Sequence, residues 1–130
     1  MIEFELVITV PEKEFEQIIA KAVGGVPEPY KSRLENIAFI AEEEVLPEQA
    51  RKLNLAPNVL LFGLYEGVPP VARNTAAKLL PDKITIYKKP HELVSQNLKD
   101  FKAKVGHTVW HEVGHYFGLS DAQIHALDGR

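Results

Sequence analysis

The stretch "HEVGH", residues 111–115, contains two histidines four positions apart with a glutamate directly after the first. On a helix, residues four apart have β-carbons about 5–6 Å apart, so both imidazoles can bind one metal ion. Glu112 lies beside them, where a carboxylate can take a proton from an attacking water. The spacing therefore predicts a zinc site with His111 and His115 as ligands and Glu112 as the catalytic base.

A third protein ligand must come from another part of the chain. After His115 the sequence contains no glutamate, and its remaining donors are Asp121, His125 and Asp128. Gly118 can end the helix in a left-handed conformation, which lets the chain turn back. We expect Asp121 to return to the histidine side and complete the site, with His125 or an upstream residue as the alternatives. Three protein ligands leave one position open for water.

The motif falls within a helical pattern that predicts one helix from Pro90 to Gly118. At 100° per residue, Glu112 lies between the histidines and the apolar face. Trp110 is expected in or beside the core and His91 at the surface, while His107 either supports the site or is exposed. The apolar face of this predicted helix comprises Val94, Leu98, Phe101, Val105, Val109, Val113 and Tyr116.

The rest of the chain alternates between strand and helix patterns. A period of two predicts a strand over residues 2–10, and further strands are expected in residues 36–45, 58–67 and 82–87. Helical spacing predicts helices over residues 12–23 and 47–55, the first starting with a capping box of Thr9 and Glu12 and ending at Gly24-Gly25. Residues 71–81 fit a loop or a short helix. The expected architecture is one α+β domain, residues 1–130, with a short mixed sheet packed against helices.

Composition limits the classes of partner. The chain has 130 residues, 45% of them hydrophobic, and a net charge of −3. That charge provides no electrostatic attraction for nucleic acid, and no apolar run approaches the length of a membrane span. The sequence contains no cysteine, so metal ligands must be histidine, carboxylate or backbone oxygen. Acidic residues near the start, where a signal peptide would be basic, favour a cytoplasmic protein.

The longer stretch "HEVGHYFGLSD" resembles the zincin signature H-E-x-x-H-x-x-G-x-x-[H/D]. The segments "NIAFIAEEE", "LFGLYEGVPPVARN" and "LPDKITIYKKP" are similar to those of the small bacterial and archaeal zincin-like metallopeptidase family. The likeness covers residues 12–127. It implies a minimal zincin-like fold, zinc bound by His111, His115 and Asp121, and Glu112 as general base. The chain lacks the later histidine and methionine of metzincins and the later glutamate of gluzincins.

The resemblance also implies a function, the hydrolysis of peptides or unfolded protein segments. Zincins hold the peptide against an edge strand, and residues Ile84–Tyr87 are our candidate for that strand. Alternatives are a metal-dependent endoribonuclease, which Glu112 and the negative charge disfavour, or a non-catalytic module that binds metal or peptide. Candidate donors to the developing oxyanion are Tyr65, Tyr87, Arg73 and His107.

Overall fold

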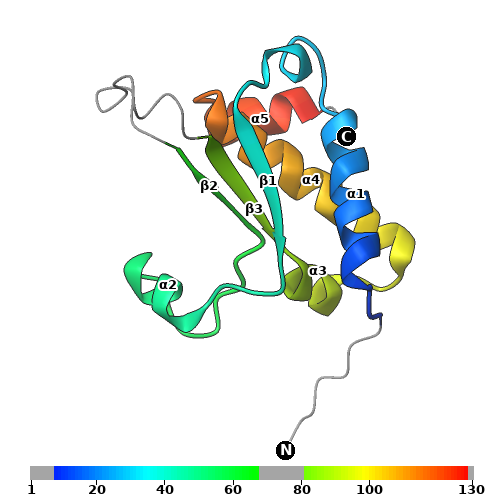
Figure 1. The fold of residues 1–130 in the computed structure, drawn as a ribbon, viewed down its shortest axis with the longest axis vertical. Coiled ribbons are helices and arrows are strands. Elements are labelled where there is room, and N and C mark those ends of the chain that lie inside the picture. Colours follow the sequence, from blue (N-terminus) through cyan, green and yellow to red (C-terminus); the bar gives the residue numbers. More distant parts are fainter. Residues whose placement is uncertain (1–7, 68–80, 129–130) are drawn as a thin grey trace, which may run out of the picture.

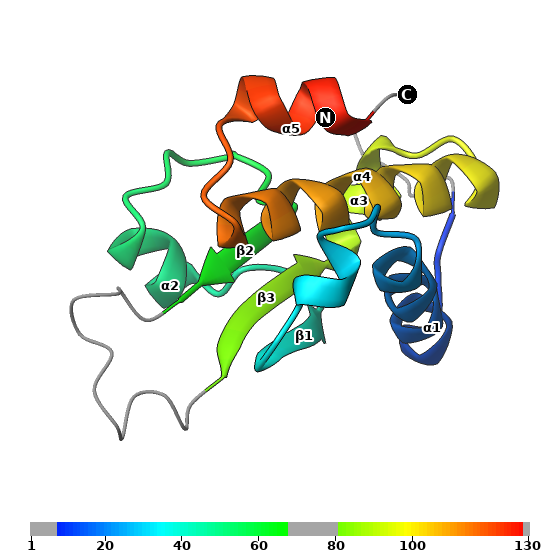
Figure 2. The same cartoon turned by 90° about the horizontal axis from the view of Figure 1, so that it is seen from above.

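The structure is a computed structural model that describes residues 8–67 and 81–128. It confirms the predicted α+β fold, in which helices cover a short mixed sheet (Figure 1). Viewed from above, α4 lies between the sheet and α5 (Figure 2). The strands are β1 (Ile37–Glu42), β2 (Gly63–Glu66) and β3 (Asp82–Tyr87); the helices are α1 (Glu12–Gly24), the 3-10 turn η1 (Lys31–Arg33), α2 (Pro47–Lys52), α3 (Lys88–Val94), α4 (Leu98–Tyr116) and α5 (Asp121–Asp128).

The strand order in this sheet is β1-β3-β2. β3 pairs in parallel with β1 and antiparallel with β2, so that Ile84 is opposite both Phe39 and Tyr65. The prediction that Ile84–Tyr87 forms the edge strand is therefore wrong. These residues are central and buried because they have a strand on each side. Within the described residues, β2 is an edge of the sheet, and it is the strand that packs against α4 beside the motif.

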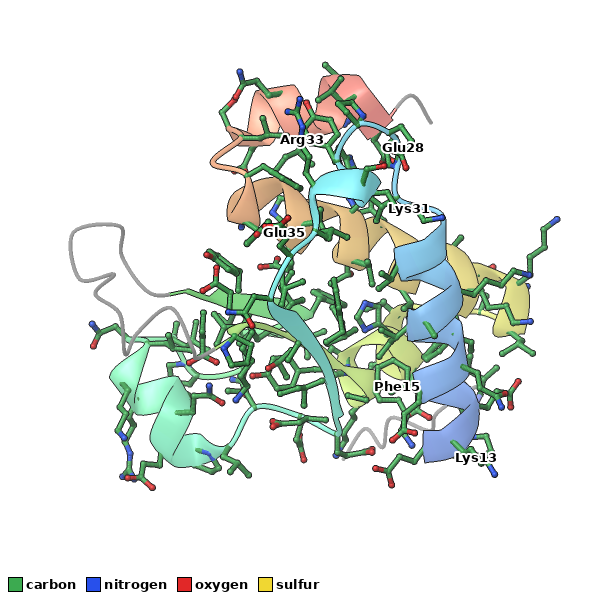
Figure 3. The ribbon with its side chains drawn as sticks, turned by 45° about the horizontal axis from the view of Figure 1, so that its top comes forward. Lys13, Phe15, Glu28, Lys31, Arg33 and Glu35 are labelled. Carbon is green, nitrogen blue, oxygen red and sulfur yellow. The ribbon has the colours of Figure 1, made fainter. Side chains whose placement is uncertain are left out.

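The core lies between the sheet and helices α1 and α4. The valine face of α4 is fully buried, as predicted, and Trp110 is 3% exposed. On α1 the side chains of Phe15, Ile18 and Ile19 are also buried, and Phe15 packs edge-on against Phe101 with ring centroids 5.9 Å apart. Figure 3 shows Phe15 on the sheet side of α1 and Lys13 on the outer side. This packing fixes the orientation of α4, and with it the face that carries the histidines.

The single helix predicted from Pro90 to Gly118 is two helices, α3 and α4, in the structure. Ser95 is extended, with φ −98° and ψ 139°, and the Asn97 side chain accepts a hydrogen bond from the backbone N–H of Asp100 at 2.8 Å. Asparagine is a strong helix N-cap, because its side chain satisfies a free N–H at the first turn. As a result Val94 and Leu98, predicted for the core, are 37% and 39% exposed.

The N-terminal segment also differs from expectation. α1 starts after Pro11 with no side-chain cap, so the predicted capping box of Thr9 and Glu12 is wrong, whereas the predicted end at Gly24-Gly25 is confirmed. Residues 1–7 and 71–80 lie outside the described residues, as do the predictions made for them. Residues 8–10 are not in a strand; instead Val10 donates from its N–H to Glu92 at 2.7 Å. None of the described helices is long and apolar enough to cross a bilayer.

Candidate metal centre

Three potential metal ligands meet at the C-terminal end of α4. Donor atoms of His111, His115 and Asp121 all lie within 4.8 Å of one another. Asp121 Oδ1 is 3.2 Å from His115 Nε2 and 3.7 Å from His111 Nε2. Ligands about 2.0–2.1 Å from a tetrahedral zinc ion are separated by about 3.3 Å. The spacing and the N/O donor set therefore fit one zinc-sized ion.

A tight turn after α4 brings Asp121 to the histidines. Gly118 has φ +74°, the left-handed conformation that the sequence predicts. Its N–H donates to the carbonyl of His115 at 3.0 Å, and the N–H of Leu119 donates to the carbonyl of Gly114 at 2.9 Å. These two bonds form a Schellman motif, which closes a helix and reverses the chain.

The helix α5 then holds Asp121 in place as its first residue. Ser120 and Gln123 exchange side-chain and backbone hydrogen bonds of 2.8 and 3.1 Å, a capping box that fixes the start of the helix. Ile124 is 1% exposed and packs against α4 at Gly114, and the indole of Trp110 donates to the carbonyl of Ile124 at 3.1 Å. α5 is thus docked on α4, the arrangement visible in Figure 2.

Glu112 is more buried than the two histidines. Its side chain is 9% exposed, against 35% for His111 and 38% for His115. One carboxylate oxygen lies 3.6 Å from His115 Nδ1. On the other side, a β-carbon on Gly63 would lie 3.0 Å from Glu112 Cγ and 2.8 Å from Thr108 Cγ2. Strand β2 therefore packs directly against this glutamate. Gly63 was not among the predicted site residues, although a glycine within a strand often marks a close approach of this kind.

Two tyrosines that were predicted as candidate oxyanion donors form hydrogen bonds with other side chains. The Tyr65 hydroxyl donates to Asp82 at 3.0 Å, and the Tyr87 hydroxyl donates to Gln49 at 3.3 Å. Burial, with the nearby charges of Glu42 and Glu66, raises the pKa of Tyr87 to about 12. Arg73 lies outside the described residues.

The two remaining histidines of the motif region differ in their distance from the site. His107 lies one turn before His111, with ring centroids 6.4 Å apart, and its Nδ1 is 3.0 Å from a carboxylate oxygen of Asp128. His125 is exposed on α5 and does not belong to the three-residue donor group. Among the described candidates for oxyanion donor, His107 therefore lies next to the potential ligand His111.

His91 was predicted at the surface, and this prediction is wrong, because the side chain is fully buried. Its Nδ1 lies 2.6 Å from the carbonyl oxygen of Tyr87, and its Nε2 lies 2.8 Å from the Thr108 hydroxyl. Burial lowers the pKa of His91; the Lys104 charge adds to this, and the hydrogen bond to Tyr87 opposes it. The error arose because Pro90 suggested a helix start, whereas α3 begins at Lys88 and turns His91 inward.

The fold and this donor set are those of a small zincin-type protein. Residues 34–130 match the family described as zincin-like metallopeptidase. The chain therefore belongs to the zincin-like metallopeptidase family, as its motif predicts. A solved structure, that of a conserved hypothetical protein from Thermus thermophilus, is similar with a TM-score of 0.58 and 21% identity, covering 83% of this chain and 94% of the other. That likeness concerns the fold. No curated protein matches the chain.

Proposed function

We propose that this protein is a zinc-dependent peptidase, in which His111, His115 and Asp121 hold the metal and Glu112 is the general base. The observation that carries the proposal is the convergence of three donor atoms within 4.8 Å, with the buried carboxylate of Glu112 beside them. Membership of the zincin-like metallopeptidase family supports the same reaction class. Zinc bound by three protein ligands supplies a Lewis acid and lowers the pKa of a water in the fourth position toward about 7.

Glu112 is suited to move the proton that peptide hydrolysis requires. Its side chain is confined between Gly63 and His115, so the carboxylate is held on the side of α4 where the ligands lie. In this role Glu112 takes a proton from the attacking water and delivers it to the leaving amine. A fixed base contributes typically 10²–10⁴-fold to such a reaction.

The free edge of β2 is the place where a peptide would be held. β2 is next to Glu112, and no strand of the described residues pairs with its outer side. An extended peptide can add to such an edge through main-chain hydrogen bonds. β2 thus replaces Ile84–Tyr87 as the candidate edge strand, and it brings the peptide backbone alongside the proposed base.

Among the candidates that the structure describes, His107 is the best placed donor for the developing oxyanion. It lines the same pocket as His111 and Glu112, and the Asp128 carboxylate contacts its Nδ1. The Asp128 carboxylate orients the ring by accepting from Nδ1, and the other nitrogen can donate to an oxyanion when the ring is the doubly protonated imidazolium. The hydroxyls of Tyr65 and Tyr87, in contrast, already donate hydrogen bonds to Asp82 and Gln49, respectively.

The test is digestion of a peptide library by zinc-loaded wild type and by Glu112→Gln. We expect the wild type to cleave and the variant to be slower by about 10²–10⁴-fold, with the same zinc content by elemental analysis. Cleavage at an equal rate in both proteins would show that Glu112 is not the base. Substoichiometric zinc even after titration would contradict the metal site, and zinc binding without any cleavage would support the non-catalytic alternative.

A further inference from the structure

The buried ring of His91 lies where α4 meets the sheet. Its Nδ1 is 2.6 Å from the carbonyl oxygen of Tyr87, the last residue of β3, and its Nε2 is 2.8 Å from the Thr108 hydroxyl on α4. The ring of Phe62, directly before β2, packs edge-on against the imidazole with centroids 5.1 Å apart. This one side chain therefore connects the end of β3, the start of β2 and α4.

The two hydrogen bonds determine where the ring of His91 carries its proton. A carbonyl oxygen can only accept, so Nδ1 donates to Tyr87. Burial lowers the pKa of His91 and favours the neutral ring, in which Nε2 has no proton and accepts from the Thr108 hydroxyl. Thr108 Oγ1 is also 3.1 Å from the carbonyl oxygen of Lys104. Two acceptors thus hold this hydroxyl, and with it the χ1 angle of Thr108.

The hydroxyl and the methyl group of Thr108 are bonded to the same carbon, so fixing one fixes the other. The methyl group faces β2, because a β-carbon on Gly63 would lie 2.8 Å from Thr108 Cγ2 and 3.0 Å from Glu112 Cγ. Residues four apart are neighbours on one face of a helix, and Thr108 and Glu112 both meet β2 at this glycine. The orientation of Thr108 therefore sets how closely β2 approaches Glu112.

We propose that His91 and Thr108 are positioning residues of the peptidase. Their hydrogen bond holds the Thr108 methyl group against Gly63, and this contact sets the distance between Glu112, the base, and β2, where the peptide is held. The inference rests on the proposed function and adds two residues that act only through Gly63 and Glu112.

Thr108→Val is the most direct test, because valine keeps the shape and a γ-methyl group but has no hydroxyl. The new methyl group would meet His91 Nε2 at 2.8 Å, whereas nonbonded carbon atoms need about 3.5–4.0 Å, so α3 and α4 must separate by roughly 1 Å. A misplacement of about 1 Å can cost about 10²-fold in rate, and we expect kcat to fall by about 10-fold or more on a peptide identified by the library digestion. The fall in kcat/KM should be equal, as for an interaction that acts in the transition state, and zinc affinity should be unchanged.

Ser95→Ala is the matched control for removal of a buried hydroxyl. Ser95 is 2% exposed at the end of α3, and its hydroxyl has no hydrogen-bond partner among the described residues. Its removal should leave kcat unchanged. A purely structural role of Thr108 would lower the urea midpoint of Thr108→Val and leave the kcat of the folded protein at the wild-type value, and that result would overturn the proposal.

Substitutions at His91 test whether the two residues act as one unit. His91→Gln can place its side-chain oxygen near the position of Nε2 and still accept from Thr108, so it should keep most of the wild-type kcat. His91→Phe loses both hydrogen bonds and should resemble Thr108→Val. Residues that act together give non-additive effects, so combining His91→Phe with Thr108→Val should lower kcat no further than the slower single variant. Additive losses would contradict the proposal. If His91→Phe does not fold, Thr108→Val and His91→Gln still decide between the outcomes.

NMR of the wild type and Thr108→Val separates failure of this inference from failure of the proposed function, because it needs no turnover. At neutral pH the His91 ring should show a protonated Nδ1 and an unprotonated Nε2, and the Thr108 methyl group should give an NOE to the α-protons of Gly63. The NOEs between Gly63 and the Glu112 side chain should change in Thr108→Val. A protonated Nε2, or the same Glu112 contacts in both proteins, would overturn the inference. Absence of cleavage by the wild type, with these NMR results as expected, would contradict the proposed function alone.

Discussion

Gly114 and Ile124 are in such close contact that a β-carbon on Gly114 would lie 2.5 Å from Ile124 Cδ1. Gly114 is the fourth residue of the HEVGH motif, and Ile124 is the buried anchor of α5. The missing side chain allows α5 to lie directly on α4, and α5 carries Asp121. The glycine inside the motif thereby determines where Asp121, the proposed third ligand, lies.

Gly114→Ala is expected to weaken zinc binding, although it changes no ligand. The new methyl group must push Ile124 outward, and α5 with Asp121 moves with it. Loss of an interaction that orients a ligand typically reduces metal affinity by about 10–100-fold. Competition with a zinc chelator measures this.

The matched control is Gly106→Ala on the same helix. A β-carbon there would meet nothing within 4 Å, so zinc affinity should be unchanged. The helix should gain roughly 0.5–1 kcal/mol of stability, because alanine is the better helix former. If the two variants bind zinc equally well, the contact of Gly114 with Ile124 does not position Asp121.

Replacing the third ligand should affect zinc affinity more than any other change on α5. Asp121→Ala removes an oxygen that lies 3.2 Å from His115 Nε2, leaving two protein ligands where zinc sites have at least three. We expect zinc affinity to fall by at least about 100-fold, beyond the effect of losing an orienting residue. His125→Ala, one turn further along α5, should bind zinc like wild type. A larger effect of His125→Ala would reverse the assignment.

Gly63→Ala is expected to reduce turnover without weakening the metal site. The added methyl group would lie 2.8 Å from Thr108 Cγ2 and 3.0 Å from Glu112 Cγ, so both side chains must shift to accommodate it. Displacement of a catalytic group by about 1 Å can cost about 10²-fold in rate, so a smaller shift of Glu112 should lower the rate by up to about 10²-fold. Steady-state kinetics should show a lower kcat, while chelator competition gives wild-type zinc affinity. Gly24→Ala, with open space around its β-carbon, is the control, and a fall in zinc affinity in Gly63→Ala would argue against a selective effect on Glu112.

Features set by local sequence were predictable. The spacing of His111 and His115 and the glycine turn at Gly118 depend on a few neighbouring residues, and the structure brings the expected donors together. The apolar periodicity of α1 and the valine face of α4 likewise identified the core. Whether these donors bind zinc stays a prediction.

Features set by tertiary contacts were not predictable in the same way. The central position of β3 depends on which strands pair, and a six-residue strand with alternating isoleucines has the same sequence pattern at an edge or in the centre of a sheet. The burial of His91 depends on a tertiary hydrogen bond, because its Nε2 is paired with the hydroxyl of Thr108, which lies 17 residues further along the chain. The break before Asn97 had a local signal, the cap, but the continuing apolar periodicity outweighed it.

The buried His91 should make folding stability depend on pH. Its pKa is lowered in the folded state by burial, whereas an unfolded histidine titrates near 6.5. As the pH falls below about 6.5 the unfolded chain binds the proton first, so stability decreases, and the decrease ends once the pH is below the folded pKa. Above about 6.5 neither state is protonated at this residue and its full contribution is present.

Urea unfolding of metal-free protein between pH 5 and 7.5 measures this effect. The His91 contribution to the slope is at most about 1.4 kcal/mol per pH unit, the value for a difference of one bound proton. His91→Gln should lose this part of the slope, while His107→Gln, a change at an exposed histidine, should keep it. Identical slopes in His91→Gln and wild type would mean that another group is responsible. If His91→Gln does not fold, NMR titration of the His91 ring in the wild type gives its folded pKa, which must lie below that of a free histidine.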